Sequence, residues 1–262
     1  RRTERWSGRA EQEKHARNSG LRPDRGFLGH KAAKLMKRAK VTEARQQAAI
    51  AEKKTLLRNV DEADGLKLHP LAWGKSGPLV RAEGLSLSYG GRTVCAGLTF
   101  TLRPGERMAV TGPNGCGKST LLKKLCGQDV AACGTLALGA GLIVSYVPQD
   151  ASFLHGGARD YARNAGVDET MFLTLLRKLG FERVQFEKDM ADYSAGQKKK
   201  VLLARSLCES AHLYLWDEPL NYIDVLSRMQ IEQLLLDYRP TMLFVEHDAA
   251  FVRRAATGTL AL

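Results

Sequence analysis

Short strand-like segments alternate with helix-like stretches through residues 79–262. Three of them, Arg107–Thr111, Leu213–Trp216 and Met242–Val245, are short and largely apolar, and a helical pattern follows each. The strands of a parallel sheet carry such apolar runs because helices cover both faces of the sheet. The pattern therefore predicts an α/β fold with buried parallel strands.

Further elements are predicted between these segments. Leu79–Tyr89 and Thr93–Leu102 mix apolar and polar residues around Gly90 and Gly91, a pattern typical of an antiparallel hairpin. Residues 135–147 are also strand-like, which predicts a further strand. Residues 157–190 carry a helical pattern without a strand signal and predict a helical subdomain beside the sheet.

The first 60 residues have a different pattern. Two glycines and a proline in residues 18–26 mark a loop, and a long glycine-poor stretch from Leu28 to about Val60 predicts a helix. Its apolar stripe is narrow, and its other faces carry Lys31, Lys34, Lys37 and Arg38. We predict a basic αα-hairpin at residues 1–60, a connector at residues 61–78 and an α/β domain at residues 79–262.

Charge distinguishes the two parts of the chain. Residues 1–60 carry 17 Lys and Arg against 6 Asp and Glu, whereas residues 61–262 carry 23 against 22. Almost the whole net charge of +12 therefore lies in the hairpin. This favours a polyanionic partner for that segment, either nucleic acid or an anionic membrane surface, although a solvated helical face would show the same charge pattern.

Cysteine spacing and apolar runs bear on the compartment. The 5 cysteines include no C-x-x-C pair, and no apolar run approaches the ~18 residues of a membrane span or resembles a signal peptide. We predict a soluble, cytoplasmic protein with reduced thiols and no integral membrane segment. The sequence begins at Arg1 without a methionine, so we expect it to be part of a longer protein.

The strongest chemical signal follows the strand at Arg107–Thr111. This segment fits G-x-x-x-x-G-K-[ST] and reads Gly112-Pro113-Asn114-Gly115-Cys116-Gly117-Lys118-Ser119-Thr120. In such a loop the backbone N–H groups surround phosphates, the lysine reaches the β- and γ-phosphates, and the serine hydroxyl binds Mg²⁺. The segment therefore predicts a nucleotide site at a helix N-terminus.

Two carboxylates follow the strand Leu213–Trp216, where open α/β sheets bind ligands. Asp217 is a candidate Mg²⁺ ligand, and Glu218 is a candidate catalytic residue that orients an attacking water. Two acidic residues after a strand are weak support by themselves, and loop solvation would explain them equally well. The phosphate loop makes the catalytic interpretation stronger.

Residues 193–197 read Tyr193-Ser194-Ala195-Gly196-Gln197, just before a helical stretch. Ser194 there could simply cap the helix. In the order of motifs, however, the chain resembles the ATP-binding cassette (ABC) family, whose signature has the form L-S-G-G-Q. Tyr193 and Ala195 depart from that form, while Ser194, Gly196 and Gln197 match it.

The resemblance implies roles for further residues. Gln149 resembles the glutamine that senses Mg²⁺ and the γ-phosphate, His247 resembles the switch histidine, and Tyr89 stands where the family stacks an aromatic ring on adenine. Asp224 resembles the aspartate of the D-loop. The family also implies ATP hydrolysis between two cassettes, with Ser194, Gly196 and Gln197 completing the site of the partner cassette.

The segment from Asp217 to Asp224 reads D-E-P-L-N-Y-I-D and is similar to the ABC-F branch, which has two cassettes in one soluble chain. That resemblance implies a linker at residues 1–60 that reaches transfer RNA on the ribosome, a second cassette after it, and antibiotic resistance by ribosomal protection. Two alternatives are the ATP-binding subunit of a membrane transporter and a nucleic-acid-binding module with a vestigial ATP site. The presence of Lys118, Glu218 and His247 disfavours the vestigial module.

Overall fold

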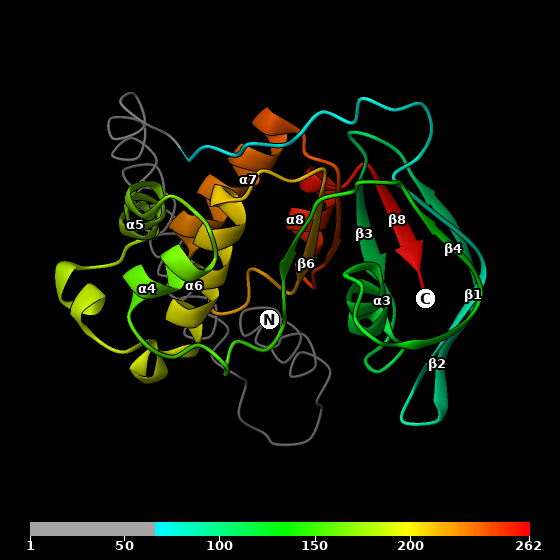
Figure 1. The fold of residues 1–262 in the computed structure, drawn as a ribbon, viewed down its shortest axis with the longest axis horizontal. Coiled ribbons are helices and arrows are strands. Elements are labelled where there is room, and N and C mark those ends of the chain that lie inside the picture. Colours follow the sequence, from blue (N-terminus) through cyan, green and yellow to red (C-terminus); the bar gives the residue numbers. More distant parts are fainter. Residues whose placement is uncertain (1–65) are drawn as a thin grey trace, which may run out of the picture. The chain divides into compact units, whose positions relative to one another are not determined.

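The computed structural model describes residues 66–262, which form two β-sheets and the helices that pack on them (Figure 1). The predicted basic hairpin of residues 1–60 lies outside the described residues. Within residues 66–262, no helix has the length and apolar character needed to cross a membrane.

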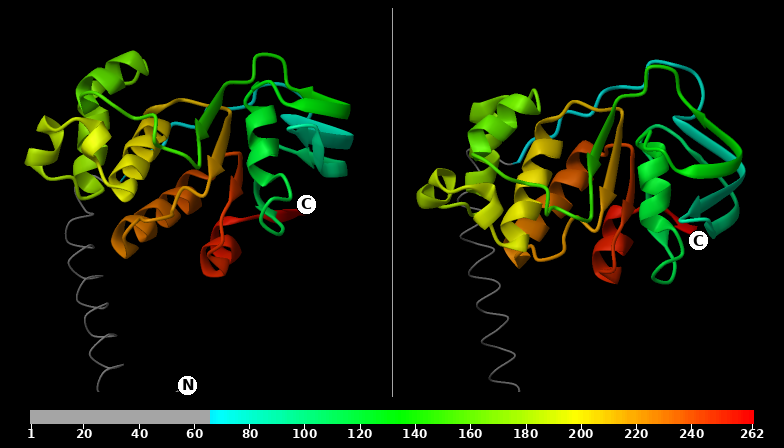
Figure 2. Two further views of the ribbon diagram at one scale, coloured as in Figure 1. Left: turned by 90° about the horizontal axis from the view of Figure 1, so that it is seen from below. Right: turned by 60° about the horizontal axis from the view of Figure 1, so that its bottom comes forward.

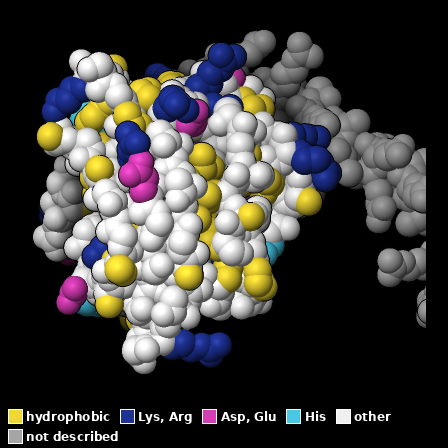
Figure 3. All heavy atoms as spheres, turned by 90° about the vertical axis from the view of Figure 1, so that its right-hand side faces the viewer, with side chains coloured by type: hydrophobic (Ala, Val, Ile, Leu, Met, Phe, Trp, Pro, Cys, Tyr) yellow, Lys and Arg dark blue, Asp and Glu magenta, His cyan; other side chains and the backbone are white. Residues whose placement is uncertain are grey.

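The first sheet is antiparallel and has three strands, in the order β2-β1-β4. Its strands are β1 (Val80–Tyr89), β2 (Arg92–Leu102) and β4 (Ala131–Leu138). Strands β1 and β2 form the predicted hairpin, and the turn between them uses Gly90 and Gly91, with φ of 57° and 77°. Figure 3 views the molecule from the side on which this sheet lies, where hydrophobic side chains are scattered among polar ones.

The second sheet has five parallel strands in the order β5-β6-β7-β3-β8. These strands are β5 (Val144–Val147), β6 (Leu213–Asp217), β7 (Met242–Val245), β3 (Arg107–Thr111) and β8 (Gly258–Ala261). Alternate side chains of β6 enter different cores: Leu213 and Leu215 enter one, and Tyr214 and Trp216 enter the other. The sheet is therefore buried on both faces, as its apolar runs predict.

Helices cover the two faces of the parallel sheet. Helix α3 (Lys118–Leu125) packs against β1 as well as β6 and β7, and therefore lies between the two sheets (Figure 2). The opposite face is covered by α6 (Ala195–Cys208), α7 (Val225–Tyr238) and α8 (Ala249–Ala255). Helices α4 (Ala158–Asn164) and α5 (Glu169–Lys178) and two 3-10 turns, Arg183–Glu187 and Met190–Asp192, complete the predicted helical subdomain.

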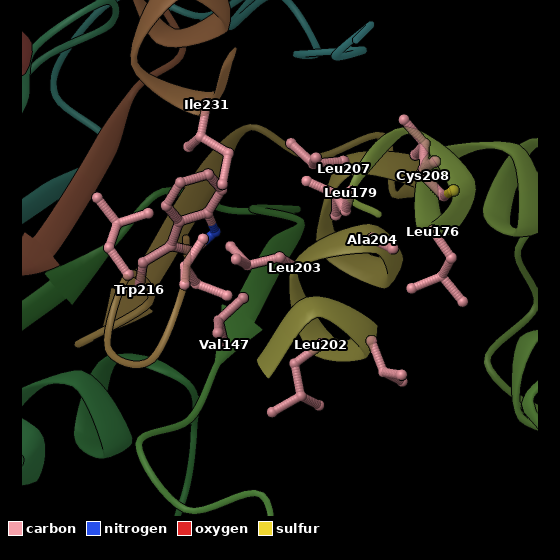
Figure 4. Packing of buried hydrophobic residues seen from close by; sticks show 14 of the residues in the cluster. Val147, Leu176, Leu179, Leu202, Leu203, Ala204, Leu207, Cys208, Trp216 and Ile231 are labelled. Atoms are coloured by element: carbon pink, nitrogen blue, oxygen red, sulfur yellow. The ribbon is translucent and has the colours of Figure 1, made fainter. Parts of the chain in front are cut away.

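The core beneath α6 is organised around Trp216. Its indole ring lies among side chains from three other elements, including Val147 of β5, Leu203 of α6 and Ile231 of α7 (Figure 4). The indole Nε1 donates a hydrogen bond to Ser206 Oγ at 2.9 Å. A buried tryptophan thus fills the space between sheet and helices while its polar atom keeps a partner.

The prediction of one strand at residues 135–147 is wrong. The segment contains the end of β4 and the whole of β5, which belong to different sheets. A turn at residues 139–141 separates the strands, and Gly141 adopts φ of 77° there. At Gly139 a Cβ atom would lie 2.4 Å from the Trp73 ring, so this glycine lets the ring pack on the backbone.

Residues 66–78, from the predicted connector, belong to the same compact unit as the nucleotide-binding domain. The side chain of Leu68 is 1% exposed within the core under α6. The Leu71 amide donates to the Ala211 carbonyl at 2.8 Å, and the Trp73 ring meets the edge of His212 at 5.3 Å between centroids. This segment therefore contributes to the stability of the domain.

We expect Leu68→Ala to destabilise the domain by about 2–5 kcal/mol, because it removes buried methyl groups and leaves a cavity. Leu71→Ala is the matched control, since the Leu71 side chain is 36% exposed and its backbone hydrogen bond survives the change. Urea unfolding monitored by tryptophan fluorescence measures both. Equal, small losses for the two variants would show that residues 66–78 do not support the fold.

Candidate functional site

A cavity of about 510 Å³ lies where strands β3, β5, β6 and β7 end. Open α/β sheets bind ligands at this edge because loops from several strands meet there. All but Val94 of the residues that line the cavity are predicted site residues, and the full lining consists of Tyr89, Val94, Asn114, Gly115, Gly117, Lys118, Ser119, Thr120, Gln149, Glu218 and His247.

Three glycines of the phosphate loop have left-handed backbone conformations, and two of them also lack room for a Cβ atom. Gly112 has φ of 144°, and a Cβ atom there would lie 2.8 Å from both the Cys116 Sγ and the Leu262 carbonyl oxygen. Gly117 has φ of 99°, and a Cβ atom would lie 3.1 Å from Val94 Cγ2. Both positions therefore require glycine.

Helix α3 presents an uncapped N-terminus to this cavity. Its N-cap is Gly117, no side chain accepts a hydrogen bond from the first amides, and its first turn has no acidic residue. The amides at the start of a helix, together with its dipole, attract anions. The loop and helix can thus hold a phosphate without a competing carboxylate.

Lys118 places an ammonium group at the centre of the loop. Its Nζ donates to the carbonyls of Gly112 at 2.9 Å and Pro113 at 3.0 Å, and the residue is 8% exposed. These contacts hold a cation at the point where the phosphates of a nucleotide would lie. Gly112 and Cys116 belong to the loop but do not line the cavity.

Asp217 lies beneath the cavity at the end of β6 and is 1% exposed. Neither of its carboxylate oxygens has a hydrogen-bond partner among the described residues. Burial raises the pKa of this carboxyl group, and the Ser119 hydroxyl and the Lys199 ammonium oppose that rise. A buried carboxylate with free oxygens beside a serine hydroxyl fits a Mg²⁺ ion, whose preferred ligands are oxygen atoms.

Glu218 and His247 line the cavity and contact each other there. His247 Nε2 lies 3.2 Å from Glu218 Oε1, and Asn221 Nδ2 donates to Glu218 Oε2 at 2.6 Å. The Glu218 amide also donates to the Val245 carbonyl at 3.0 Å, although the residue adopts a left-handed φ of 48°. This strained conformation is held by surrounding contacts, as at many functional sites.

The remaining cavity residues lie at its edge. Tyr89 ends β1, and its side chain is 68% exposed, so its ring can accept a stacked base. Gln149 is exposed and follows β5 after Pro148. Within residues 66–262, neither side chain makes a hydrogen bond that would prevent contact with a ligand in the cavity.

The residues that match the signature lie outside this cavity, at the start of α6. Ser194 caps the helix: its hydroxyl accepts from the Gln197 amide at 3.3 Å, and Gln197 Oε1 accepts from the Ser194 amide at 2.9 Å. A Cβ atom on Gly196 would lie 2.6 Å from the Tyr222 carbonyl oxygen. The structure therefore does not bring these residues into the cavity of their own chain.

Sequence reasoning missed three residues that shape the site. Val94 lines the cavity and leaves little room for a Cβ atom on Gly117. Asn221 donates a hydrogen bond to Glu218, and Lys199 Nζ donates to the carbonyls of Pro148 and Asp217. Asn221 lies only three positions after Glu218 in the sequence, so its contact with the Glu218 carboxylate could have been predicted. Val94 and Lys199 meet the site through tertiary contacts, which no local pattern reveals.

The geometry agrees with comparisons to known proteins. A family model described as ABC transporter matches residues 95–221. The zinc import ATP-binding protein ZnuC of Ruegeria pomeroyi is 34% identical over 71% of this chain and 75% of that protein. The chain belongs to the ABC family. It is thus an ABC-type ATPase domain with a P-loop NTPase fold, and ABC cassettes bind ATP and act in pairs.

Other relatives are longer than this chain. The ATP-binding protein Uup of Caulobacter vibrioides is 30% identical over 98% of this chain, which spans 40% of that protein. The ribosome protection protein VmlR of Bacillus subtilis is 29% identical over 70% of this chain and 34% of its own length. Among solved structures, the archaeal ribosome recycling factor aABCE1, in complex with the ribosomal stalk protein aP1, matches with a TM-score of 0.57 and 24% sequence identity. The match covers 75% of this chain and 40% of that chain. This last likeness shows the fold alone.

We expect Lys118→Ala to weaken ATP binding about 10- to 100-fold, because it removes charge-assisted hydrogen bonds to phosphate. Lys124→Ala is the matched control on the same helix, since Lys124 donates to the Val130 carbonyl and does not line the cavity. Isothermal titration with ATP gives both dissociation constants. Unchanged affinity in the Lys118 variant would contradict the assignment of the cavity to phosphate binding.

Proposed function

We propose that this chain is one cassette of a soluble, cytoplasmic ABC-F ATPase that acts on the ribosome and gives antibiotic resistance by ribosomal protection. The observation that carries the proposal is that the similarity to Uup extends over 98% of the chain. It therefore includes most of the basic residues 1–60. The similarity to ZnuC covers only 71% of the chain. The basic segment thus has a counterpart in Uup.

Three further observations support this proposal. VmlR is named as a ribosome protection protein and is similar over 70% of this chain. Residues 1–60 carry almost all of the net charge of +12, as a segment that contacts ribosomal RNA or transfer RNA requires. The segment from Asp217 to Asp224 adds the resemblance to the ABC-F branch.

For ATP hydrolysis we propose separate roles for the residues around the cavity. Tyr89 stacks on the base, and the loop amides, Asn114, Thr120 and Lys118 hold the phosphates. Ser119, Asp217 and Gln149 hold Mg²⁺, which neutralises developing phosphate charge when it is bound. Glu218 orients the attacking water, and His247 contacts the γ-phosphate.

The geometry around Glu218 supports its role. Asn221 and His247 bind one carboxylate oxygen each, so the side chain has a fixed orientation toward the cavity. Water positioning needs such a held acceptor more than it needs covalent chemistry. Ser194, Gly196 and Gln197 lie away from this cavity, which agrees with a role in completing the site of a second cassette.

The second candidate function is the ATP-binding subunit of a membrane transporter. Similarity to ZnuC, a zinc import ATP-binding protein, favours it, and the ATP site alone does not separate the two functions. A transporter subunit has no need of a basic segment that binds RNA. The basic segment is therefore the feature to test.

We expect Glu218→Gln to bind ATP normally while its turnover falls by a factor of about 10²–10⁴, because the amide keeps the shape but loses the charge that orients water. Steady-state phosphate release, measured at several protein concentrations, tests this. Turnover at the parental rate would assign the catalytic role to another residue.

We expect charge reversal at Lys31, Lys34, Lys37 and Arg38 to weaken ribosome binding and to reduce its salt dependence. The slope of log K against log salt is negative, and each lost phosphate contact reduces its magnitude by roughly 0.7–0.9. A salt titration of binding to purified ribosomes measures this slope. ATP affinity should stay unchanged, because the residues proposed to hold ATP all belong to the cassette.

The control reverses four exposed charges of the cassette instead: Arg92, Arg183, Lys188 and Arg253. This control should retain the parental slope. If the first variant also retains the parental slope, residues 31–38 do not contact RNA and the transporter interpretation gains support.

A further inference from the structure

Lys199 is a buried lysine next to the nucleotide cavity that does not line it. The residue lies in the first turns of α6 and is 4% exposed. Its Nζ donates to the Pro148 carbonyl at 2.8 Å and to the Asp217 carbonyl at 3.1 Å. A charged amine is rarely buried without such partners.

The two carbonyls lie at the ends of two neighbouring strands, beside the proposed Mg²⁺ residues Gln149 and Asp217. Pro148 directly precedes Gln149 and follows β5, and Asp217 ends β6. These strands pair in parallel, and their last recorded pair is Val147 with Trp216. Pro148 has no N–H group, so it cannot donate to the backbone of β6 and extend the pairing.

Lys199 therefore supplies hydrogen-bond donors at the end of β5, where the backbone of Pro148 has none. Its ammonium joins the ends of β5 and β6 just beyond their last backbone pair. Burial lowers the pKa of the Lys199 amine, and the carboxylates of Asp217, Glu218 and Glu246 oppose that fall. Lys198, its neighbour in sequence, lines a second pocket together with Lys199 and Gln149, but among the described residues only Lys199 donates to both carbonyls of this junction.

We propose that Lys199 is a positioning residue that holds the Gln149 loop against the end of β6, so that Gln149 and Asp217 are presented together to Mg²⁺. This inference rests on the proposed Mg²⁺ roles of those two residues and is independent of the ribosomal partner. The ammonium acts through the backbone and does not touch the nucleotide.

The test compares Lys199→Met, Lys199→Arg and the matched control Lys198→Met in the 262-residue chain. Calorimetry with a non-hydrolysable ATP analogue gives the dissociation constant in EDTA and in Mg²⁺. The ratio of the two constants is the gain in affinity due to Mg²⁺. In the parent and in Lys198→Met this gain should be the same.

We expect Lys199→Met to bind the analogue in EDTA as the parent does, while its Mg²⁺ gain falls about tenfold, the usual cost of losing support behind a metal ligand. Lys199→Arg should recover most of the gain, because it restores a buried cation with N–H donors. If the methionine variant does not fold, Lys199→Leu replaces it, since leucine also lacks a donor.

The outcomes separate the inference from its basis. A full Mg²⁺ gain in a folded Lys199→Met or Lys199→Leu variant overturns the inference, and lowered thermal stability with an unchanged gain would assign Lys199 a purely structural role. If the parent itself shows no Mg²⁺ gain, the proposed roles of Gln149 and Asp217 fail instead.

Discussion

The site depends on the parallel, in-register pairing of β3, β5, β6 and β7. Val110 pairs with Val245, Asp217 also pairs with Val245, and Val147 pairs with Trp216. The loops that follow these strands therefore start at one level of one edge. The phosphate loop, Gln149, Glu218 and His247 converge there because strand polarity is shared and burial on both faces keeps the strands in place.

This convergence concentrates acidic groups in a buried place. Burial raises the pKa of both Asp217 and Glu246. Glu246 has partners, since it accepts from the Leu220 amide at 2.7 Å and the His247 amide at 3.3 Å, whereas the Asp217 oxygens have none among the described residues. An unpaired buried carboxylate destabilises the fold. A cation that binds only the folded state would relieve this cost, which is consistent with the Mg²⁺ role proposed for Asp217.

Much of the fold could be predicted because its signals are local. The β1–β2 hairpin has a two-glycine turn, and the strand–loop–helix unit at residues 107–125 carries a motif with few other interpretations. The strand prediction at residues 135–147 failed because an apolar, β-prone run does not show that its two halves join different sheets. Strand β8, with the sequence GTLA, is too short for a period to appear and forms through its pairing with β3.

The site shows the same division between local and tertiary information. Residues 112–120 lie within one motif, whereas Lys199 reaches its two carbonyls only after α6 packs on the sheet. Its charge in a K-K-K run looks like surface solvation in the sequence. Burial, which the sequence does not record, is what makes the middle lysine different from its neighbours.

Residues at the start of α6 make contacts within their own cassette as well as having a proposed role toward a partner cassette. This affects how variants there are interpreted. Gly196 has no room for a Cβ atom against its own Tyr222 carbonyl, and Lys200 binds Asp224 Oδ2 at 2.7 Å, so this helix end is tied to the segment after β6 in the same chain. A Gly196 variant that loses activity has therefore disturbed its own cassette before any partner is considered. Ser194 differs, because its described contact is a helix cap, and asparagine or aspartate can also cap a helix. Replacements that keep the cap at Ser194 thus separate a role toward a partner cassette from a role in local folding, whereas replacements at Gly196 do not.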